Sequence, residues 1–335
     1  MTTTHPSDAR VGVVGGGAWG TALANAAAAA GHDVTLWLRD REAARRLQEA
    51  RENARYLPGV PLHRRIAATG EADALGAAAT ILLVVPAQTV RGVLADLKRA
   101  FAPGAAVVLC AKGIERGSDS FMSAVAAECL PGTPIAVLSG PSFAADVARN
   151  LPTAVTLAAD DATLAARLAA TLSGPTLRVY HTDDVRGVEV GGAGKNVLAI
   201  ASGIVAGRGL GESARAALIA RAFAELMRFA RAYGGRPETL MGLSGLGDLV
   251  LTASSPQSRN FAFGLALGGG AVPEEAAGGK LAEGAHTAAA LVALARARSV
   301  EMPVAEAVAA IVAGEASVET VIAALLARPL RGEAE

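Results

Sequence analysis

Two lysines stand where a protonated amine could bind or protonate a substrate oxygen. The chain has 31 lysines and arginines, of which four are lysines, so arginine is its usual cation. A lysine in such a sequence can mark a site that needs a compact ammonium able to exchange a proton. Lys112 follows an aliphatic run, and Lys195 lies among small residues that would let a ligand approach the backbone. Lys98 and Lys280 lie in charged or glycine-rich surroundings and are expected at the surface.

A glycine-rich motif near the N-terminus is suited to binding phosphate. Gly15-Gly16-Gly17-Ala18-Trp19-Gly20 has the spacing G-x-G-x-x-G and stands between an apolar run and a helical pattern. Gly15 permits the tight turn, Gly17 lets the backbone approach a pyrophosphate, and Gly20 allows the helix to pack close to the strand. The phosphates would meet the positive end of the helix dipole. We interpret the motif as a dinucleotide site, because a ligand-free glycine turn would not need these flanking elements.

Arg39 indicates which dinucleotide is bound. An acidic residue about 20 residues after the glycine motif usually binds the adenosine ribose. Arg39 occupies that place or the one beside it, and a guanidinium there favours the 2′-phosphate of NADP. Asp40 follows directly, so NAD stays open as an alternative. We expect NADP(H) or NAD(H) as the cofactor, with NADP(H) favoured.

Short aliphatic runs alternate with helical patterns over the first half of the chain. Runs of this length, bounded by Gly and Pro, are typical of buried strands. Their alternation with helices predicts a parallel sheet covered on both faces, which is a doubly wound, Rossmann-type α/β arrangement. The predicted strands cover residues 10–14, 33–38, 80–85, 105–111, 134–139, 153–158 and 177–180, and the predicted helices cover residues 18–30, 40–51, 89–101, 119–130, 143–150 and 162–172.

Strand patterns stop near residue 188, and the rest of the sequence shows helical periodicity. We therefore predict a dinucleotide-binding domain over residues 1–187 and an all-α domain that binds the substrate over residues 188–335. The predicted helices of the second domain cover residues 190–205, 212–233, 261–267, 287–297, 303–313 and 318–327.

Composition argues against several other classes of protein. The 335 residues are 52% hydrophobic but only 4% aromatic, as expected for cores of small aliphatic side chains. Equal numbers of basic and acidic residues, 31 of each, create no field that would attract nucleic acid or anionic lipid. Because no apolar run approaches roughly 18 residues and no signal peptide is recognised, we expect a cytoplasmic protein without membrane insertion. Cys110 and Cys129 are expected to be reduced, and the five histidines show no metal-ligand spacing, so no metal is predicted.

Seven short segments, spread over nearly the whole chain, form a recognisable set. They are GGGAWGTALA from Gly15, KGIE from Lys112, SGPSFA from Ser139, VEVGGAGKN from Val188, GLGDL from Gly245, SRN from Ser258 and AEG from Ala282. In this order they resemble the bacterial NAD(P)-dependent glycerol-3-phosphate dehydrogenase family. The resemblance implies reversible, NAD(P)H-dependent reduction of dihydroxyacetone phosphate to sn-glycerol 3-phosphate, which would supply glycerophospholipid synthesis.

The resemblance also implies roles for individual residues. Lys195 would donate or accept the proton at the reacting oxygen, which agrees with the chemistry, because hydride arriving at a ketone carbon leaves charge on its oxygen. Burial and the charge of Lys112 would lower the pKa of Lys195 toward neutrality. Arg259 and Asn260 would supply donors to the phosphate dianion. The substrate site would be lined by Lys112, Gly140, Ser142, Lys195, Asp248, Ser258, Arg259 and Asn260, and the cofactor would contact Gly15, Gly17, Ala18, Trp19, Gly20, Arg39, Lys112, Ala144, Arg259 and Glu283.

Three positions leave alternatives open. Asp248 could orient the lysine, bind a substrate hydroxyl, or only cap a helix that begins after Gly247. The family usually has serine where Ala18 stands and a larger residue where Gly194 stands. Loss of the serine hydroxyl would remove one phosphate contact, and glycine inside a helix costs roughly 1 kcal/mol relative to alanine.

Two other functions are compatible with these motifs. A related β-hydroxy acid or keto acid reductase would share both domains and a lysine near their junction. A non-catalytic NADPH-binding sensor would keep the glycine motif but would not need Lys195 together with Arg259. None of the three tyrosines has a lysine four residues later, which argues against the Tyr-x-x-x-Lys class of reductases. The apolar helix faces of the second domain would suit a homodimer.

Overall fold

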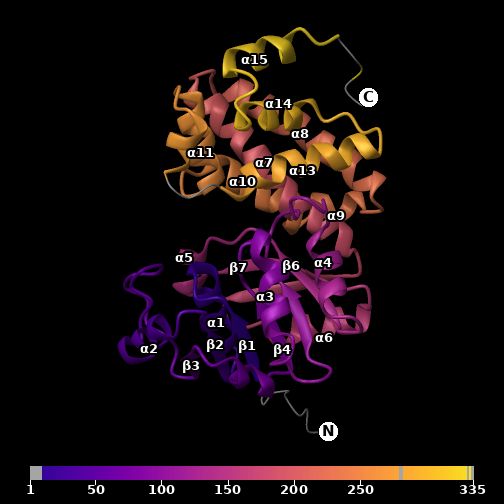
Figure 1. Cartoon of the computed structure of the whole chain (residues 1–335). Coiled ribbons are helices and arrows are strands. Elements are labelled where there is room, and N and C mark those ends of the chain that lie inside the picture. Colours follow the sequence, from indigo (N-terminus) through magenta and orange to yellow (C-terminus); the bar gives the residue numbers. More distant parts are fainter. Residues whose placement is uncertain (1–9, 279–281, 330–331, 333–335) are drawn as a thin grey trace.

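A computed structural model describes residues 10–278, 282–329 and 332 of the chain. An α/β unit formed by the first half lies below a unit of helices formed by the second half (Figure 1). Beyond residue 182 the described residues form helices and connecting loops only. This order confirms the predicted fold class. Lys280, which was predicted to lie at the surface, falls outside the described residues.

Eight strands form a single sheet. They are β1 Val11–Val14, β2 Val34–Trp37, β3 Ile66–Thr69, β4 Thr80–Leu83, β5 Ala106–Leu109, β6 Ile135–Ser139, β7 Thr153–Ala158 and β8 Leu177–Thr182. Their order is β3-β2-β1-β4-β5-β6-β7-β8, so the direction of winding reverses between β1 and β4. The register pairs Val14 with Leu83 and Leu83 with Leu109, which brings the carboxyl ends of β1, β4 and β5 level at one edge. Open α/β sheets bind ligands at such an edge, beside the reversal point.

The prediction of a fully parallel sheet is wrong at one position, and one strand was not predicted. β6 and β7 pair antiparallel, whereas the other pairs are parallel. The segment between them holds only the five-residue helix α5 (Ala144–Ala148), which is shorter than a parallel crossover usually requires. β3 has the sequence Ile-Ala-Ala-Thr at the sheet edge, and a single large aliphatic residue gives no recognisable strand pattern.

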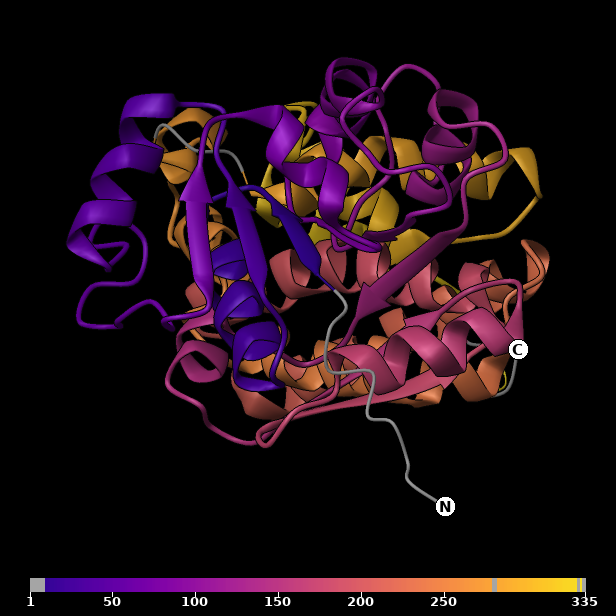
Figure 2. The same cartoon turned by 90° about the horizontal axis from the view of Figure 1, so that it is seen from below.

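Helices cover both faces of the sheet, as predicted. They are α1 Ala18–Ala29, α2 Arg41–Ala50, α3 Val90–Leu97, α4 Met122–Cys129 and α6 Ala162–Leu172, with the 3₁₀ segments η1 Ala72–Ala77 and η2 Ala87–Thr89. Val13 packs in a core that includes Leu23 of α1, while its neighbour Val14 packs in a second core that includes Leu94 of α3. Successive residues of a strand point to opposite faces, so the two cores lie on the two sides of the sheet. Figure 2 shows the helices on either side.

The helical unit is built around one buried helix, α7 (Val185–Gly207). The helices packed against it include α8 Glu212–Ala232, α10 Asp248–Ser254, α11 Arg259–Gly268, α13 Glu283–Ala297 and α14 Pro303–Val312. Glycines let α11 approach closely, since a Cβ added at Gly203 would lie 2.2 Å from the carbonyl oxygen of Phe261. By length and composition α7 could cross a membrane, but 89% of that stretch is buried inside the protein, which is typical of a core helix.

The remaining elements are short or terminal. They are α9 Pro237–Met241, the π-helical turn η3 Leu243–Gly247, α12 Pro273–Ala277 and α15 Val318–Leu326. The sequence did not predict α9, η3 and α12, and it gave α10 only as an alternative interpretation of Asp248, because five to seven residues are too few to show a helical period. The predicted domain boundary between residues 187 and 188 falls within the first turn of α7.

Candidate active site

A buried ammonium and a part-buried one share one buried carboxylate where the α/β unit meets the helical unit. The side chain of Asp248, at the first residue of α10, is 2% exposed. Its Oδ1 accepts a hydrogen bond from Lys195 Nζ at 3.0 Å, and its Oδ2 accepts one from Lys112 Nζ at 2.6 Å. Lys195 comes from the middle of α7, and Lys112 from the loop after β5. Three residues far apart in the sequence therefore meet, and Asp248 does so instead of capping α10.

Each ammonium has one further acceptor. Lys195 Nζ donates to Thr252 Oγ1 at 2.8 Å, one turn after Asp248 in α10. Lys112 Nζ donates to the carbonyl oxygen of Gly140 at 3.0 Å. Gly140 follows β6 with φ +152°, and a Cβ there would lie 2.8 Å from Val155 Cα, so this position requires glycine. Two of the three N–H groups of each lysine are used in this way, which leaves the third for a ligand.

The surroundings of Lys195 bring the pKa of its amine close to neutral pH. Burial lowers the pKa of Lys195 to about 8; the ammonium of Lys112 adds to this decrease, and the carboxylate of Asp248 opposes it. This outcome confirms the predicted direction. For Asp248, burial alone would raise the pKa, but the charges of the two lysines outweigh burial and lower it. At neutral pH the centre thus holds an ionised carboxylate beside an amine that exchanges protons readily.

A chain of amide hydrogen bonds connects Lys112 to the start of α13. Asn196 Nδ2 donates to the carbonyl oxygen of Lys112 at 3.1 Å, and Asn260 Nδ2 donates to Asn196 Oδ1 at 2.9 Å. Asn260 Oδ1 then accepts from the backbone N–H of Gly284 at 2.9 Å. Asn260, predicted to bind substrate, therefore has much of its amide engaged within the protein. Asn196 was not predicted, although it directly follows Lys195.

Glu283, at the first residue of α13, brings a second, part-buried carboxylate near the centre. Its Oε1 accepts a hydrogen bond from the backbone N–H of Ala87 at 3.4 Å, so α13 contacts the 3₁₀ turn after β4. Burial raises the pKa of Glu283, against the opposing charges of Arg259, Lys195 and Lys112. These three cations therefore lie close enough to Glu283 to act on its charge.

The other predicted substrate residues lie at the ends of α5 and α11. Ser142 Oγ donates to the same Gly140 carbonyl oxygen that binds Lys112, at 3.0 Å. Ser258 is buried and caps α11, because its Oγ accepts from Phe261 N at 3.2 Å. Arg259 is exposed at the first turn of α11, where its guanidinium is available to an anionic ligand.

The glycine motif has the geometry that a pyrophosphate requires. Gly15 has φ +119°, and a Cβ there would lie 2.2 Å from the carbonyl oxygen of Val84. A Cβ at Gly20 would lie 1.9 Å from the carbonyl oxygen of Gly15, whereas at Gly17 nothing lies within 4 Å. Gly17 is also the N-cap of α1 and provides no side-chain cap, so the first N–H groups of the helix face this open space. The residues present therefore fit a dinucleotide phosphate.

Arg39 and Asp40 differ in their availability at the end of β2. The carboxylate of Asp40 caps α2, since its Oδ1 accepts from Ala43 N at 3.0 Å. Arg39 is exposed, and within the described part of the chain no ion pair involves it. The carboxylate that could bind a ribose hydroxyl is thus engaged elsewhere, while the guanidinium that could bind a 2′-phosphate is accessible.

Both departures from the family pattern lie in packed surroundings. A Cβ added at Gly194 would lie 2.3 Å from Leu226 Cδ1, so the Leu226 side chain would have to shift to admit a larger residue. Ala18 and Trp19 begin α1 and pack against the same core as Ala144 of α5. Position 18 therefore adjoins the apolar core as well as the predicted phosphate site.

Comparison with known proteins agrees with this geometry. Residues 10–165 match the N-terminal family described as NAD-dependent glycerol-3-phosphate dehydrogenase, and residues 184–323 match its C-terminal counterpart. The chain is 78% identical to glycerol-3-phosphate dehydrogenase [NAD(P)+] of Methylobacterium radiotolerans, over 97% of this chain and 98% of that protein. It is 60% identical to the enzyme of the same name from Azorhizobium caulinodans, over the same shares of the two chains.

Solved structures show the same relationship. The crystal structure of glycerol-3-phosphate dehydrogenase from Coxiella burnetii superposes with a TM-score of 0.91 at 40% identity, covering 96% of this chain and 100% of that one. A ketopantoate reductase from Ralstonia eutropha superposes with a TM-score of 0.60 at 20% identity, covering 91% of this chain and 98% of that one, which shows a shared fold alone. The chain belongs to the NAD-dependent glycerol-3-phosphate dehydrogenase family.

Proposed function

We propose that the protein reduces dihydroxyacetone phosphate to sn-glycerol 3-phosphate, reversibly, with NADPH or NADH as the reductant. The observation that carries this proposal is the Lys195–Asp248–Lys112 centre, in which a buried amine that titrates near neutrality is held beside an ionised carboxylate. The product would supply glycerophospholipid synthesis. The curated relatives of this family share both the name and nearly the full length of the chain, which supports the assignment.

The chain's own residues manage the proton of this reaction. When bound, a reduced nicotinamide would supply the hydride that the ketone carbon accepts. Lys195 Nζ stabilises the charge that develops on the carbonyl oxygen and then gives that oxygen its proton, which converts the ketone to the alcohol. Asp248 and Thr252 hold Nζ in place by accepting two of its N–H groups. In the reverse direction, neutral Lys195 accepts the proton from the hydroxyl.

Substrate recognition depends on cations and small residues around this centre. Lys112 and Arg259 supply positive charge for the phosphate dianion, with Arg259 giving planar, paired donors. Small residues at Gly140 and Ser142 let the substrate approach the backbone beside Lys112. We propose that the substrate is bound by the residues that the sequence resemblance implied, which are Lys112, Gly140, Ser142, Lys195, Asp248, Ser258, Arg259 and Asn260.

A direct assay tests the proposal. Purified protein is mixed with NADPH and dihydroxyacetone phosphate while the absorbance of reduced nicotinamide is followed, with NADH and a panel of keto acids in parallel. Oxidation of NADPH with dihydroxyacetone phosphate alone is expected. Turnover with a keto acid but not with dihydroxyacetone phosphate would instead place the protein among the reductases that share only its fold. Binding of NADPH without any turnover would identify a sensor.

The rate of reduction is expected to decrease above about pH 8. Lys195 must be protonated to act as the acid, and its pKa of about 8 means that the protonated fraction falls above that pH. The kcat/KM for dihydroxyacetone phosphate should therefore fall about tenfold per pH unit on the alkaline side. The kcat/KM for glycerol 3-phosphate, which needs the neutral amine, should rise up to about pH 8 and then level off. Parallel alkaline limbs in both directions would contradict this assignment.

Arg39→Ala is expected to weaken NADPH binding selectively. We propose that Arg39 binds the 2′-phosphate of NADP(H), because it is exposed at the end of β2 and Asp40 is occupied in capping α2. The KM for NADPH should rise about tenfold or more, since one charge-assisted contact is lost, while the KM for NADH stays within about twofold. Arg46→Ala is the control. Arg46 lies on α2, the helix that Asp40 caps, and its replacement should change neither KM value. Equal changes for both cofactors would exclude this role for Arg39.

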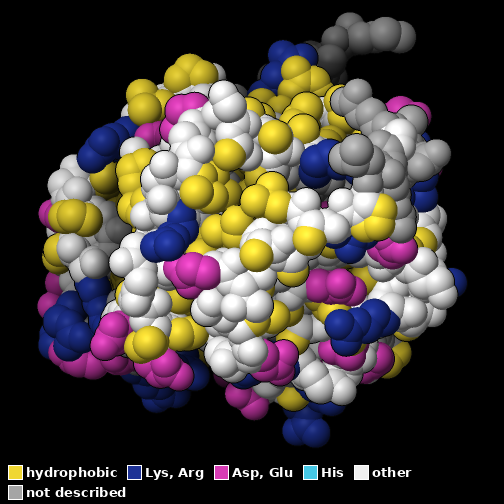
Figure 3. All heavy atoms as spheres, turned by 90° about the horizontal axis from the view of Figure 1, so that it is seen from above, with side chains coloured by type: hydrophobic (Ala, Val, Ile, Leu, Met, Phe, Trp, Pro, Cys, Tyr) yellow, Lys and Arg dark blue, Asp and Glu magenta, His cyan; other side chains and the backbone are white. Residues whose placement is uncertain are grey.

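We also propose that the boundary between the two domains of the chain lies between residues 187 and 188. We further propose that the protein is cytoplasmic, does not insert into a membrane and forms a homodimer. Hydrophobic side chains gather on the outer face of the helical unit (Figure 3). There a groove of about 240 Å³ between α14 and α15 is lined by apolar residues such as Val321 and Leu325 together with the charged Glu306 and Arg328, and Leu326 is 82% exposed. A second copy of the chain would cover this surface. Sedimentation analysis of the purified protein tests the assembly.

A further inference from the structure

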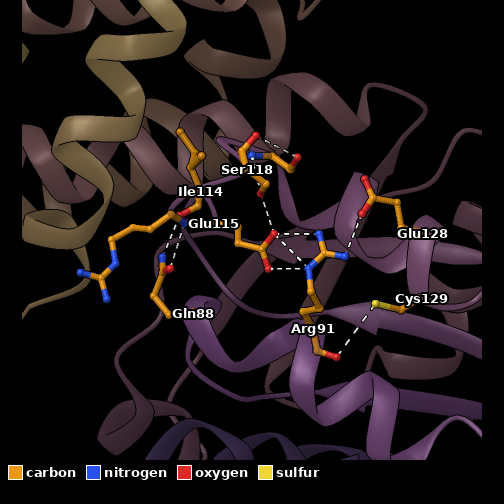
Figure 4. Close-up of polar contacts among 9 residues, drawn as sticks. Gln88, Arg91, Ile114, Glu115, Ser118, Glu128 and Cys129 are labelled. Atoms are coloured by element: carbon orange, nitrogen blue, oxygen red, sulfur yellow. Dashed lines mark hydrogen bonds and ion pairs between the residues drawn. The ribbon is translucent and has the colours of Figure 1, made fainter.

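The loop that carries Lys112 is fastened to η2 and α3 by a cluster of polar side chains outside the centre described above. The loop folds back on itself, with an antiparallel bridge between Ile114 and Phe121 and a hydrogen bond from Glu115 N to Ser120 O at 2.9 Å. Figure 4 shows Gln88 and Arg91 reaching this loop from η2 and α3. Neither residue lies in one of the seven family segments.

Gln88 binds the loop backbone with both ends of its amide. Its Nε2 donates to the carbonyl oxygen of Ile114 at 2.8 Å, and its Oε1 accepts from the backbone N–H of Arg116 at 3.0 Å. These contacts fix the chain two to four residues beyond Lys112. Gln88 also follows Ala87, whose N–H binds Glu283, so a single short turn is tied both to the loop and to α13.

Arg91 and Glu115 form a bidentate ion pair that fastens the next part of the loop. Arg91 Nε donates to Glu115 Oε1 at 2.9 Å and Nη2 donates to Oε2 at 2.7 Å, while Ser118 Oγ donates to the same carboxylate at 2.6 Å. The Glu115 side chain is 12% exposed, whereas Glu128, which binds Arg91 from α4 at 2.8 Å, is 57% exposed. The hydrogen bonds from Arg91 lower the pKa of Glu115, so the pair stays ionised. A part-buried, two-point ion pair constrains geometry more than an exposed, single contact does.

The loop also enters the core of the helical unit. Ile114 is fully buried and Phe121 is 5% exposed, and both pack in the core that contains Val197 of α7. Polar groups thus hold the loop to the α/β unit while its apolar residues hold it to the helical unit. Lys112 begins this loop, and its carbonyl oxygen is bound by Asn196. A shift of the loop would therefore move Lys112 relative to Asp248 and Lys195.

We propose that Gln88 and the Arg91–Glu115 pair are positioning residues that hold Lys112 in register with Asp248 and Lys195. The inference rests on the proposed function, because it assigns these residues to the affinity of that site for its phosphorylated substrate. Binding groups must be held within about 0.5 Å of their working positions, and a lysine on a loop needs supporting contacts to meet that limit. Displacements of about 1 Å, even from changes far from the chemistry, are enough to reduce rates strongly.

The test compares Glu115→Gln and Arg91→Gln with the wild-type enzyme. In each variant the KM for dihydroxyacetone phosphate should rise about tenfold, and clearly more than the KM for NADPH, because the glycine motif between β1 and α1 and Arg39 after β2 still bind the cofactor when Lys112 shifts. The alkaline limb of kcat/KM for reduction should also move to higher pH. Lys112 faces Lys195 together with Asp248 and Glu283, and of these only Lys112 lowers its pKa, so displacing Lys112 relieves that effect.

Glu128→Gln is the matched control, since it removes the exposed partner of Arg91 and leaves the Glu115 contacts in place. It should leave both KM values and the pH profile unchanged. Gln88→Ala removes two neutral contacts without touching the ion pair, and it decides the question if the Glu115 variant does not fold. Equal increases in both KM values, an unchanged KM for dihydroxyacetone phosphate, or the same effect from Glu128→Gln would overturn the proposal. An inactive wild-type enzyme would instead refute the proposed function.

Discussion

Replacement of Lys195 by alanine is expected to remove nearly all turnover while leaving NADPH binding almost intact. Lys195 Nζ is the proposed proton donor, and Asp248 and Thr252 cannot replace it, because the lowered pKa of Asp248 keeps it ionised and the Thr252 hydroxyl already donates to Asp248 Oδ1 at 3.2 Å. The kcat for dihydroxyacetone phosphate should fall roughly 10³- to 10⁴-fold, as for loss of a general acid that also stabilises charge. Lys112 still binds the buried carboxylate of Asp248 in the variant, so that charge is not left unpaired.

The measurement separates chemistry from cofactor binding. The kcat is taken from the loss of reduced-nicotinamide absorbance, and the Kd for NADPH from the fluorescence of the bound nicotinamide, which should stay within about twofold of the wild-type value. Lys98→Ala serves as the control, because Lys98 is exposed at the end of α3 and should affect neither quantity. Turnover retained with cofactor binding lost would exclude Lys195 as the acid and would assign it to the cofactor site.

Much of the fold could be predicted because individual elements carry their own patterns. The predicted helix at residues 162–172 has the same two ends as α6. Its start is marked by Asp161, which caps the first turn by accepting a hydrogen bond from Thr163 N. Strand direction does not have a comparable local pattern. β6 and β7 are both apolar runs, and their antiparallel pairing depends on the short connection through α5, which a parallel assumption overlooked. Conversely, β3 is held in the sheet by pairing with β2 although its alanines give no strand pattern.

The candidate site was predictable where a motif marks a residue and unpredictable where packing selects a partner. Lys112, Lys195 and Asp248 lie in separate motifs, and the structure brings all three together. Their supporting contacts depend on how α7 and α10 pack. Thr252 is one helical turn from Asp248 and Asn196 is one residue from Lys195, so their proximity was visible, but their orientation toward the lysines was not. Hydrogen bonds between side chains of different helices and strands can be predicted only when the tertiary structure is known.

Asp248→Asn is expected to change the pKa of Lys195 as well as reduce activity, whereas loss of one neutral hydrogen bond would only reduce activity. The carboxylate compensates the buried ammonium of Lys195 and the part-buried one of Lys112, and its charge raises the pKa of Lys195 against the effect of burial. With a neutral amide in its place, the pKa of Lys195 should fall further, because desolvation and the charge of Lys112 are then opposed only by the smaller effect of Glu283. The alkaline limb of kcat/KM for reduction should move below about pH 8, and kcat/KM at pH 7 should fall about 10²- to 10³-fold.

Thr252→Val provides the comparison that isolates charge from hydrogen bonding. It removes the hydroxyl of Thr252, which is the uncharged acceptor of Lys195 Nζ. The kcat/KM should fall by about tenfold, and the alkaline limb of its pH profile should stay near pH 8. Both variants are measured over the same pH range, with NADPH binding as the check that each is folded. If Asp248→Asn loses activity but keeps its limb near pH 8, the carboxylate positions the amine without controlling its protonation. A limb that moves only in Asp248→Asn would show that one buried charge keeps Lys195 protonated at the pH where the reaction needs an acid.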